Sequence, residues 1–226
     1  MRSTLAGVTA RPPFVPEAVV FDLDGLLLDS EGLWARAEAR VVTDLGHRWD
    51  PAMQRLMLGK GPRDAVEALA AHLGIDDLDD LEQRLEQATL DSFGAGAPPR
   101  PGAPQLVRAL AGWLPLGVAT NSKRALVDLT LGASGLARHI DAVVTVDDVP
   151  APKPAPDVYA TACARLRVDP RRSVAFEDSP VGVASARAAG LWVVGCPSLP
   201  GQRLDGAHVV IDSLEDVDPR QFAAAA

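Results

Sequence analysis

The sequence predicts an α/β protein, a doubly wound and mostly parallel sheet with a small α-helical domain inserted into it. Short, valine-rich apolar runs alternate with helix-length segments over most of the 226 residues. That alternation is typical of a parallel sheet whose strands are buried on both faces. One stretch, from about residue 31 to residue 95, has helical periodicity and no strand-like run, which indicates the insert.

Six apolar runs are expected to form the strands. The first, residues 18–23, ends in carboxylates. The others are residues 116–120, 142–146, 173–176, 191–195 and 209–211. Because helix-length segments separate these runs, neighbouring strands should run parallel, and their carboxyl ends should meet at one edge of the sheet, where catalytic groups gather in such folds.

The helical insert is expected to lie between two linkers. Apolar residues recur at helical spacing in two segments, Leu33, Ala37, Val41 and Val42, and Ala65, Leu69 and Leu73. Residues 29–32 would lead out of the sheet, and the Pro/Gly-rich residues 94–104 would lead back. We therefore expect a loose tail at 1–16, a catalytic core at 17–29 and 97–220, and a helical cap at 30–96.

Composition restricts the classes of function. Lys and Arg total 22 against 30 Asp and Glu, for a formal net charge of -8, so we expect no nucleic-acid partner and no anionic membrane surface. No apolar run approaches the roughly 18 residues of a membrane span. The two cysteines, Cys163 and Cys196, fit reduced core thiols, and the first sixteen residues lack the apolar stretch of a secretory signal. We expect a cytoplasmic protein, and a monomer, since no long apolar repeat points to a partner helix.

Two carboxylates follow the first strand in the sequence Phe-Asp-Leu-Asp-Gly. Asp22 and Asp24 are two residues apart, so both can face one site as the chain leaves the strand, and Gly25 allows a sharp turn. The two acids repel each other unless a cation or a shared proton lies between them, and such oxygen ligands suit a hard cation such as Mg²⁺. An acidic turn that caps the next helix is the alternative interpretation.

Three further strand ends carry polar side chains. Thr120 and Asn121 follow one strand and can bind an anion together with backbone N–H groups. Lys153 lies between prolines that stiffen its backbone. An ammonium fixed in this way can neutralise the charge of a phosphoryl group. Glu177 and Asp178 end another strand, where Asp178 can complete a metal site. Helix capping or a solvated lysine explains each feature singly, but four such strand ends together predict one site.

Together these segments resemble the four motifs of the haloacid dehalogenase superfamily of phosphotransferases. The matching residues are Asp22 and Asp24, Thr120, Lys153, and Glu177 with Asp178. The resemblance runs from about residue 18 to residue 219 and implies a Rossmann-like core. It implies a Mg²⁺-dependent phosphatase that hydrolyses small phosphomonoesters, with a sugar phosphate as first choice, through an aspartyl-phosphate. A dehalogenase is not expected, because such relatives need no metal and lack the second acid.

The same resemblance implies a role for each residue. Asp22 would attack phosphorus, and Asp24 would protonate the leaving oxygen and then activate water. Mg²⁺ would be held by the Asp22 carboxylate, the Asp24 backbone carbonyl and Asp178, with Glu177 ordering a metal-bound water or touching the ion. The phosphoryl oxygens would be bound by Thr120, Asn121 and Lys153.

The insert resembles the helical cap of the subgroup that contains β-phosphoglucomutase and the sugar-phosphate phosphatases. In that subgroup the cap closes over the site and contacts the part of the substrate remote from phosphate. Residues 29–34 resemble the start of hexose-phosphate phosphatase caps, and residues 59–63 resemble a cap loop whose arginine contacts the substrate. The expected substrate-contacting residues are Glu31, Lys60, Arg63 and Lys123. A solvated position is the alternative for Lys60 and Arg63.

Three other functions remain open. Mutases of this subgroup carry a histidine in the cap where this chain has Trp34, which disfavours a β-phosphoglucomutase-type phosphohexomutase. Packing inside the cap is the ordinary role for such a tryptophan. The cap loop is also similar to that of nucleotide-type monophosphatases such as the pseudouridine 5′-phosphatases, so the leaving group could be a nucleoside. A non-catalytic binding module is disfavoured because every charged motif group is present.

Overall fold

One parallel sheet organises the part of the chain that the computed structural model describes, residues 11–57 and 60–222. Within these residues, six strands lie in the order β3-β2-β1-β4-β5-β6, and each neighbouring pair is parallel. They are β1 (Ala18–Phe21), β2 (Leu116–Ala119), β3 (Ala142–Val144), β4 (Ser173–Glu177), β5 (Trp192–Gly195) and β6 (Val209–Val210). All six predicted strands are therefore present. The expected tail falls outside the described residues over positions 1–10.

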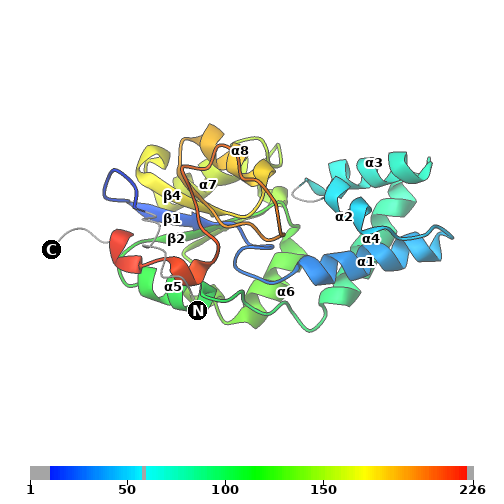
Figure 1. Cartoon of the computed structure of the whole chain (residues 1–226), viewed down its shortest axis with the longest axis horizontal. Coiled ribbons are helices and arrows are strands. Elements are labelled where there is room, and N and C mark those ends of the chain that lie inside the picture. Colours follow the sequence, from blue (N-terminus) through cyan, green and yellow to red (C-terminus); the bar gives the residue numbers. More distant parts are fainter. Residues whose placement is uncertain (1–10, 58–59, 223–226) are drawn as a thin grey trace.

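Helices cover both faces of the sheet. The strand pleat sends alternate side chains to opposite faces, so Val19 and Phe21 pack in one apolar cluster and Val20 packs in another. The first cluster contains α5 (Ala103–Leu110) and α6 (Arg124–Ser134), and the second contains α7 (Asp157–Leu166) and α8 (Pro180–Ala189). In Figure 1, α5 and α6 lie below the sheet and α7 and α8 above it. The doubly wound fold class is thus confirmed.

The remaining helices form a bundle beside the sheet, at the right of Figure 1. They are α1 (Glu31–Asp44), α2 (Pro51–Met57), α3 (Pro62–Leu73) and α4 (Leu78–Phe93). The bundle has its own apolar cluster, which includes Val42, Leu69 and Leu81. Leu33 at the start of α1 and Phe93 at the end of α4 belong instead to the cluster of the sheet domain. Both stems of the bundle are therefore anchored in the sheet's own core.

Several boundaries differ from the prediction. Strand β1 ends at Phe21 rather than at residue 23, because the chain turns at Gly25, whose φ is +79°. The Leu23 carbonyl closes this turn by accepting the N–H groups of Leu27 and Leu28, each at 3.0 Å. The outgoing linker is shorter than residues 29–32, since α1 already begins at Glu31.

Short 3₁₀ helices complete the described chain, at Ala137–His139, Val146–Asp148, Pro170–Arg172, Leu214–Asp216 and Pro219–Phe222. Cys163 and Cys196 are buried in the clusters on opposite faces of the sheet. None of the described helices has the length and apolar character needed to cross a bilayer.

Candidate active site

The predicted residues of the four motifs converge at the carboxyl edge of the sheet. Strand β1 lies between β2 and β4, so the chain winds away in opposite directions on its two sides, and such a switch point leaves a crevice beyond the strand ends. Asp22 directly follows β1, and its N–H donates to the carbonyl of Phe176 at 3.0 Å. One cavity at this edge is lined by Asp22, Asp24, Thr120, Asn121, Lys153 and Asp178, together with cap residues.

Lys153 is fixed between two carboxylates. Its ammonium lies 2.6 Å from Asp22 Oδ1 and 2.5 Å from Glu177 Oε1, and its side chain is 3% exposed. The side chain of Asn121 holds the backbone of Lys153 on both sides, since Oδ1 accepts its N–H at 2.8 Å and Nδ2 donates to its carbonyl at 3.3 Å. Burial alone would lower the pKa of Lys153, but Asp22 and Glu177 outweigh it and raise that pKa. The lysine therefore stays charged.

Glu177 is completely buried beneath the cavity, and protein donors surround its carboxylate. Oε1 accepts from Lys153 and from the Tyr159 hydroxyl at 2.7 Å. Oε2 accepts the N–H groups of Asp178 at 3.1 Å and Ser179 at 3.2 Å, and the Ser179 hydroxyl at 3.2 Å. Gly182 makes room for this carboxylate, because a Cβ there would overlap it. This geometry indicates that Glu177 holds the Lys153 ammonium in place. Tyr159 carried no signal in the sequence.

Three buried carboxylates form a candidate metal centre. Asp22, Glu177 and Asp178 each offer an oxygen within 4.8 Å of the others. Burial raises the pKa of Asp22 to about 8, against the opposing Lys153 charge, and burial together with Asp22 raises the pKa of Asp178. The site thus carries unfavourable negative charge that a cation would relieve, and an all-oxygen set fits a hard ion such as Mg²⁺. Since protein donors occupy Glu177, Asp22 and Asp178 are the carboxylates best placed as direct ligands.

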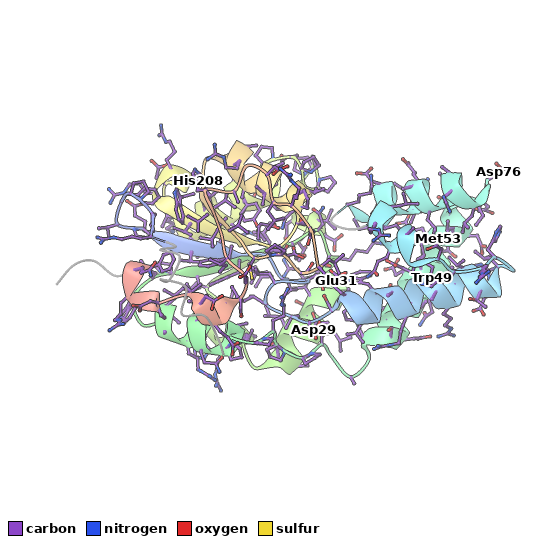
Figure 2. The ribbon with its side chains drawn as sticks, viewed as in Figure 1. Asp29, Glu31, Trp49, Met53, Asp76 and His208 are labelled. Carbon is purple, nitrogen blue, oxygen red and sulfur yellow. The ribbon has the colours of Figure 1, made fainter. Side chains whose placement is uncertain are left out.

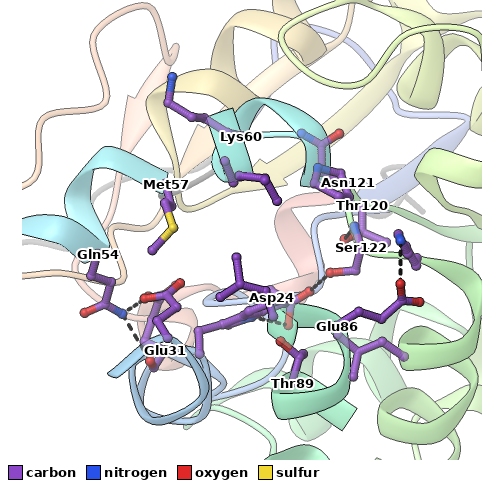
Figure 3. A pocket seen from close by; sticks show the side chains of 18 of the residues that line it. Asp24, Glu31, Gln54, Met57, Lys60, Glu86, Thr89, Thr120, Asn121 and Ser122 are labelled. Carbon is purple, nitrogen blue, oxygen red and sulfur yellow. Dashed lines mark hydrogen bonds and ion pairs between the residues drawn. The ribbon is translucent and has the colours of Figure 1, made fainter. Parts of the chain in front are cut away.

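Asp24 lies where the sheet domain meets the cap (Figure 3). Its Oδ2 accepts from the Ser122 hydroxyl at 2.6 Å, and its Oδ1 accepts from the Trp34 indole N–H at 3.4 Å. Trp34 also packs edge-on against Phe93, with ring centroids 5.2 Å apart, so it does more than fill the cap. The Thr120 hydroxyl accepts the Ser122 N–H at 3.0 Å. Ser122 directly follows the predicted Thr120 and Asn121 in the chain, but its contact with Asp24 was not foreseen.

Glu31 enters the cavity from the first turn of α1, at the junction of the two domains (Figure 2). His208 lies far from this cavity, on the sheet domain. Gln54 Nε2 donates to the Glu31 carbonyl and to its Oε2, each at 3.1 Å. Burial, and then the charge of Asp24, raises the pKa of Glu31 to about 7. Its Oε1 would lie 3.1 Å from a Cβ built on Gly25. Glu31 is therefore close to the turn that carries Asp24.

The three cationic cap-site candidates have different surroundings. Lys123 lines the cavity and pairs with Glu86 at 2.9 Å and Glu82 at 3.4 Å, so the residue just before α6 is linked to α4 of the cap. Lys60 also lines the cavity, but its ammonium points away from Asp24 in Figure 3. Arg63 is outside the cavity lining and pairs with acids of α4, at 2.9 Å from Asp79 and 3.0 Å from Glu82.

A second contact joins the cap to the sheet domain. Gly61, at the start of α3, packs on Pro152, because a Cβ built there would lie 2.8 Å from its Cγ. Pro152 precedes Lys153, so the cap loop closes beside the lysine. The cap also lines the cavity with side chains that the sequence had not singled out, Glu38, Gln54, Met57, Val66, Leu85, Thr89 and Leu90.

The chain is similar to known hydrolases in sequence and in fold. A family model described as haloacid dehalogenase-like hydrolase matches residues 16–190. Validoxylamine A 7'-phosphate phosphatase of Streptomyces hygroscopicus subsp. limoneus is 32% identical over 89% of this chain and 95% of that protein. Fructose-1-phosphate phosphatase YqaB of Escherichia coli is 32% identical over 78% of this chain and 94% of that protein. The crystal structure of CbbY from Rhodobacter sphaeroides in complex with phosphate has a TM-score of 0.78 at 29% identity, covering 88% of this chain and 95% of that one.

The chain belongs to the haloacid dehalogenase-like hydrolases. It is an enzyme of the phosphoric monoester hydrolase type, as the phosphatase relatives indicate. The predicted family, fold class and enzyme class are confirmed.

Proposed function

We propose that this protein is a Mg²⁺-dependent phosphatase that hydrolyses small phosphomonoesters, sugar phosphates first among them, through an aspartyl-phosphate on Asp22. The observation that carries the proposal is the buried Asp22–Lys153 pair, 2.6 Å long, at the floor of a cavity that the cap covers. Phosphoryl transfer needs positioning and charge neutralisation above all, and a fixed ammonium beside a carboxylate nucleophile provides both.

In the first half of the reaction, an Asp22 oxygen forms a bond to phosphorus as the bond to the ester oxygen breaks. Asp24 gives its proton to the departing oxygen, so the leaving group departs as an alcohol. The hydroxyl of Ser122 at 2.6 Å holds Asp24 in position for this transfer. The phosphoryl group is then carried by Asp22.

In the second half, Asp24 accepts a proton from water as the water oxygen bonds to phosphorus. The Asp22–phosphorus bond breaks, inorganic phosphate leaves, and the Asp22 carboxylate and protonated Asp24 are regenerated. Trp34 at the cap boundary, whose N–H donates to Asp24 at 3.4 Å, helps to keep the acid aligned in both halves.

We assign the binding of the phosphoryl oxygens to the side chains of Lys153 and Thr120, together with backbone N–H groups of the segment after β2. Asn121 supports this set by holding the Lys153 backbone. Mg²⁺ would be held by Asp22, Asp178 and the Asp24 carbonyl, and it would neutralise phosphoryl charge and keep the nucleophile ionised. Glu177 supports Lys153 beneath this set.

We keep the proposed division into a core at 17–29 and 97–220 and a cap at 30–96, because α1–α4 share their own apolar cluster. The cap would select the leaving group through Glu31, Lys60 and Lys123, which line the cavity. Arg63 would first have to leave its acidic partners on α4. A monomer suffices, since one chain supplies both walls. The separation of Cys163 and Cys196 on opposite faces of the sheet supports a cytoplasmic setting.

The alternatives are a phosphohexomutase and a nucleoside 5′-monophosphatase. Against the mutase stands the Trp34–Asp24 hydrogen bond. The indole that contacts the general acid does not gain or lose a proton near neutral pH, whereas the histidine of the mutases does. For the nucleoside, the cavity offers Trp34, Met57 and Leu90 as apolar lining. Both alternatives use the same Asp22 chemistry, so substrates must separate them.

The test is a phosphate-release screen over hexose, pentose and nucleoside monophosphates, with and without Mg²⁺. We expect release that needs Mg²⁺ and that Asp22→Asn lowers by about 10³-fold or more. Mass spectrometry of acid-quenched enzyme should find one phosphoryl group on the peptide of Asp22. Retained activity in Asp22→Asn would refute the nucleophile, and hexose phosphate interconversion that needs a bisphosphate primer would favour the mutase.

A further inference from the structure

The cap wall of the cavity is acidic. Four of its lining residues are glutamates, Glu31, Glu38, Glu82 and Glu86. Glu82 and Glu86 are ion-paired with Lys123. Over the described part of the chain, no Lys, Arg or His nitrogen forms an ion pair with Glu31 or Glu38. A phosphate group bound at Lys153 does not account for these two acids.

Glu38 is the more unusual of the two. It is 7% exposed, it lines the cavity, and its Oε2 is buried with no hydrogen-bond partner. Burial, and then the charge of Glu31, raises its pKa to about 8. A buried carboxyl without a partner costs about 1–3 kcal/mol, and native structures satisfy nearly all such groups. A carboxyl that destabilises the free protein, and that faces a cavity, is well suited to bind a ligand.

The position of Glu38 on α1 sets how far such a ligand must extend. Glu31, Trp34 and Glu38 are at i, i+3 and i+7, so they share one face of the helix. Seven residues correspond to about 10 Å along a helix axis. Glu31 lies beside the Gly25 turn, and α1 runs outward from the sheet domain (Figure 1). Glu38 is therefore roughly 10 Å farther into the cap than Glu31.

We propose that Glu38 is a specificity-determining residue whose carboxyl binds a hydrogen-bond donor, a hydroxyl or an amino group, on the part of the leaving group farthest from phosphorus. The inference rests on the proposed phosphatase function. It restricts the preferred substrates to those with a polar end beyond the reach of a three-carbon ester. Met57, Val66, Leu85 and Leu90 line the same cavity, so the donor meets Glu38 in mostly apolar surroundings, where an unmade hydrogen bond is costly.

The test compares a long substrate with a short one. In Glu38→Met, which keeps the side-chain length, kcat/KM for the best hexose or aminohexose phosphate should fall about 10- to 100-fold. For glycerol 3-phosphate, which does not reach Glu38, it should change less than about twofold. Asp44→Asn is the matched control, an exposed carboxylate on the same helix, and it should change neither value. Equal losses on both substrates, or none, would overturn the proposal.

Two further arms keep the test decisive. Glu38→Gln should preserve the rate with a hexose phosphate within a few fold if a hydroxyl is bound, and should lose the preference for an aminohexose phosphate if an ammonium is bound. If the wild-type chain releases phosphate from no substrate, the proposed function fails, but ligand binding still tests the role of Glu38. The thermal shift produced by glucose 6-phosphate or glucosamine 6-phosphate should then be lost in Glu38→Met and kept in Asp44→Asn. An equal shift in both variants would refute the role of Glu38.

Discussion

Replacing Glu177 by glutamine should destabilise the protein far more than a one-atom change suggests. The carboxylate accepts from five donors, two at Oε1 and three at Oε2. An amide has one acceptor oxygen, so in either orientation at least two donors lose their acceptor and meet an NH₂ group instead. The change also leaves Lys153 buried with Asp22 as its remaining carboxylate partner.

The size of the effect follows from these contacts. Hydrogen bonds to a charged group contribute about 1.5–3 kcal/mol each, so two lost bonds amount to roughly 3–6 kcal/mol. In a chain of this length about 1 kcal/mol corresponds to roughly 2–4 °C. We expect Glu177→Gln to lower Tm by roughly 6–24 °C and to lower phosphatase activity, since Lys153 is no longer held in place.

Thermal unfolding followed by circular dichroism, with urea unfolding for the free energy, measures this loss. Glu67→Gln is the matched control, because Glu67 is a half-exposed acid on α3 whose ion pair with Arg63 is 3.6 Å long; it should cost no more than about 0.5 kcal/mol. If Glu177→Gln melted within about 2 °C of the wild type, the carboxylate would not be the fully occupied support inferred here.

Three other predictions concern the acid, the metal and pH. Ser122→Ala removes the 2.6 Å hydrogen bond to Asp24 and should lower kcat about tenfold with little change in KM; an unchanged kcat would contradict the positioning role. Adding Mg²⁺ should raise Tm, because the ion binds the folded chain and relieves the repulsion between Asp22 and Asp178; Asp178→Asn should abolish that rise, and an equal rise in the variant would count against the site. The pKa of Glu38 is raised by burial from 4.5 to about 8, so the unfolded chain loses this proton before the folded chain does, and wild-type stability is lost as pH rises through that window. Glu38→Gln should therefore gain about 2–4 kcal/mol over the wild type between pH 5 and pH 8 in urea unfolding, and a gain that does not depend on pH would refute the raised pKa.

The strands and the core motifs were predictable because their signals are local. An apolar run that stops at an acid marks both a buried strand and its end, and parallel pairing then brings the ends together. This reasoning led to Asp22 and Asp178 in one cavity without any knowledge of the cap, and the flanking prolines led separately to Lys153.

The contacts between cap and core were not predictable in the same way. The ion pairs of Arg63 with α4 and the hydrogen bond of Trp34 to Asp24 depend on how helices pack in space, which periodicity does not specify. Glu38 did carry a signal. Positions 34, 38 and 41 share a helix face, and Glu38 is an acid between the apolar Trp34 and Val41.

The anchoring of both cap stems has a consequence for turnover. Leu33 and Phe93 belong to the apolar cluster of the sheet domain, so the bundle cannot detach there without exposing that cluster to water. The opposite rim is joined by the exposed Lys123–Glu86 pair and by the contact of Gly61 with Pro152, which are far weaker restraints. Substrate should therefore enter, and phosphate leave, through an opening on the Lys153 side of the cap, while the two stems stay fixed to the sheet domain.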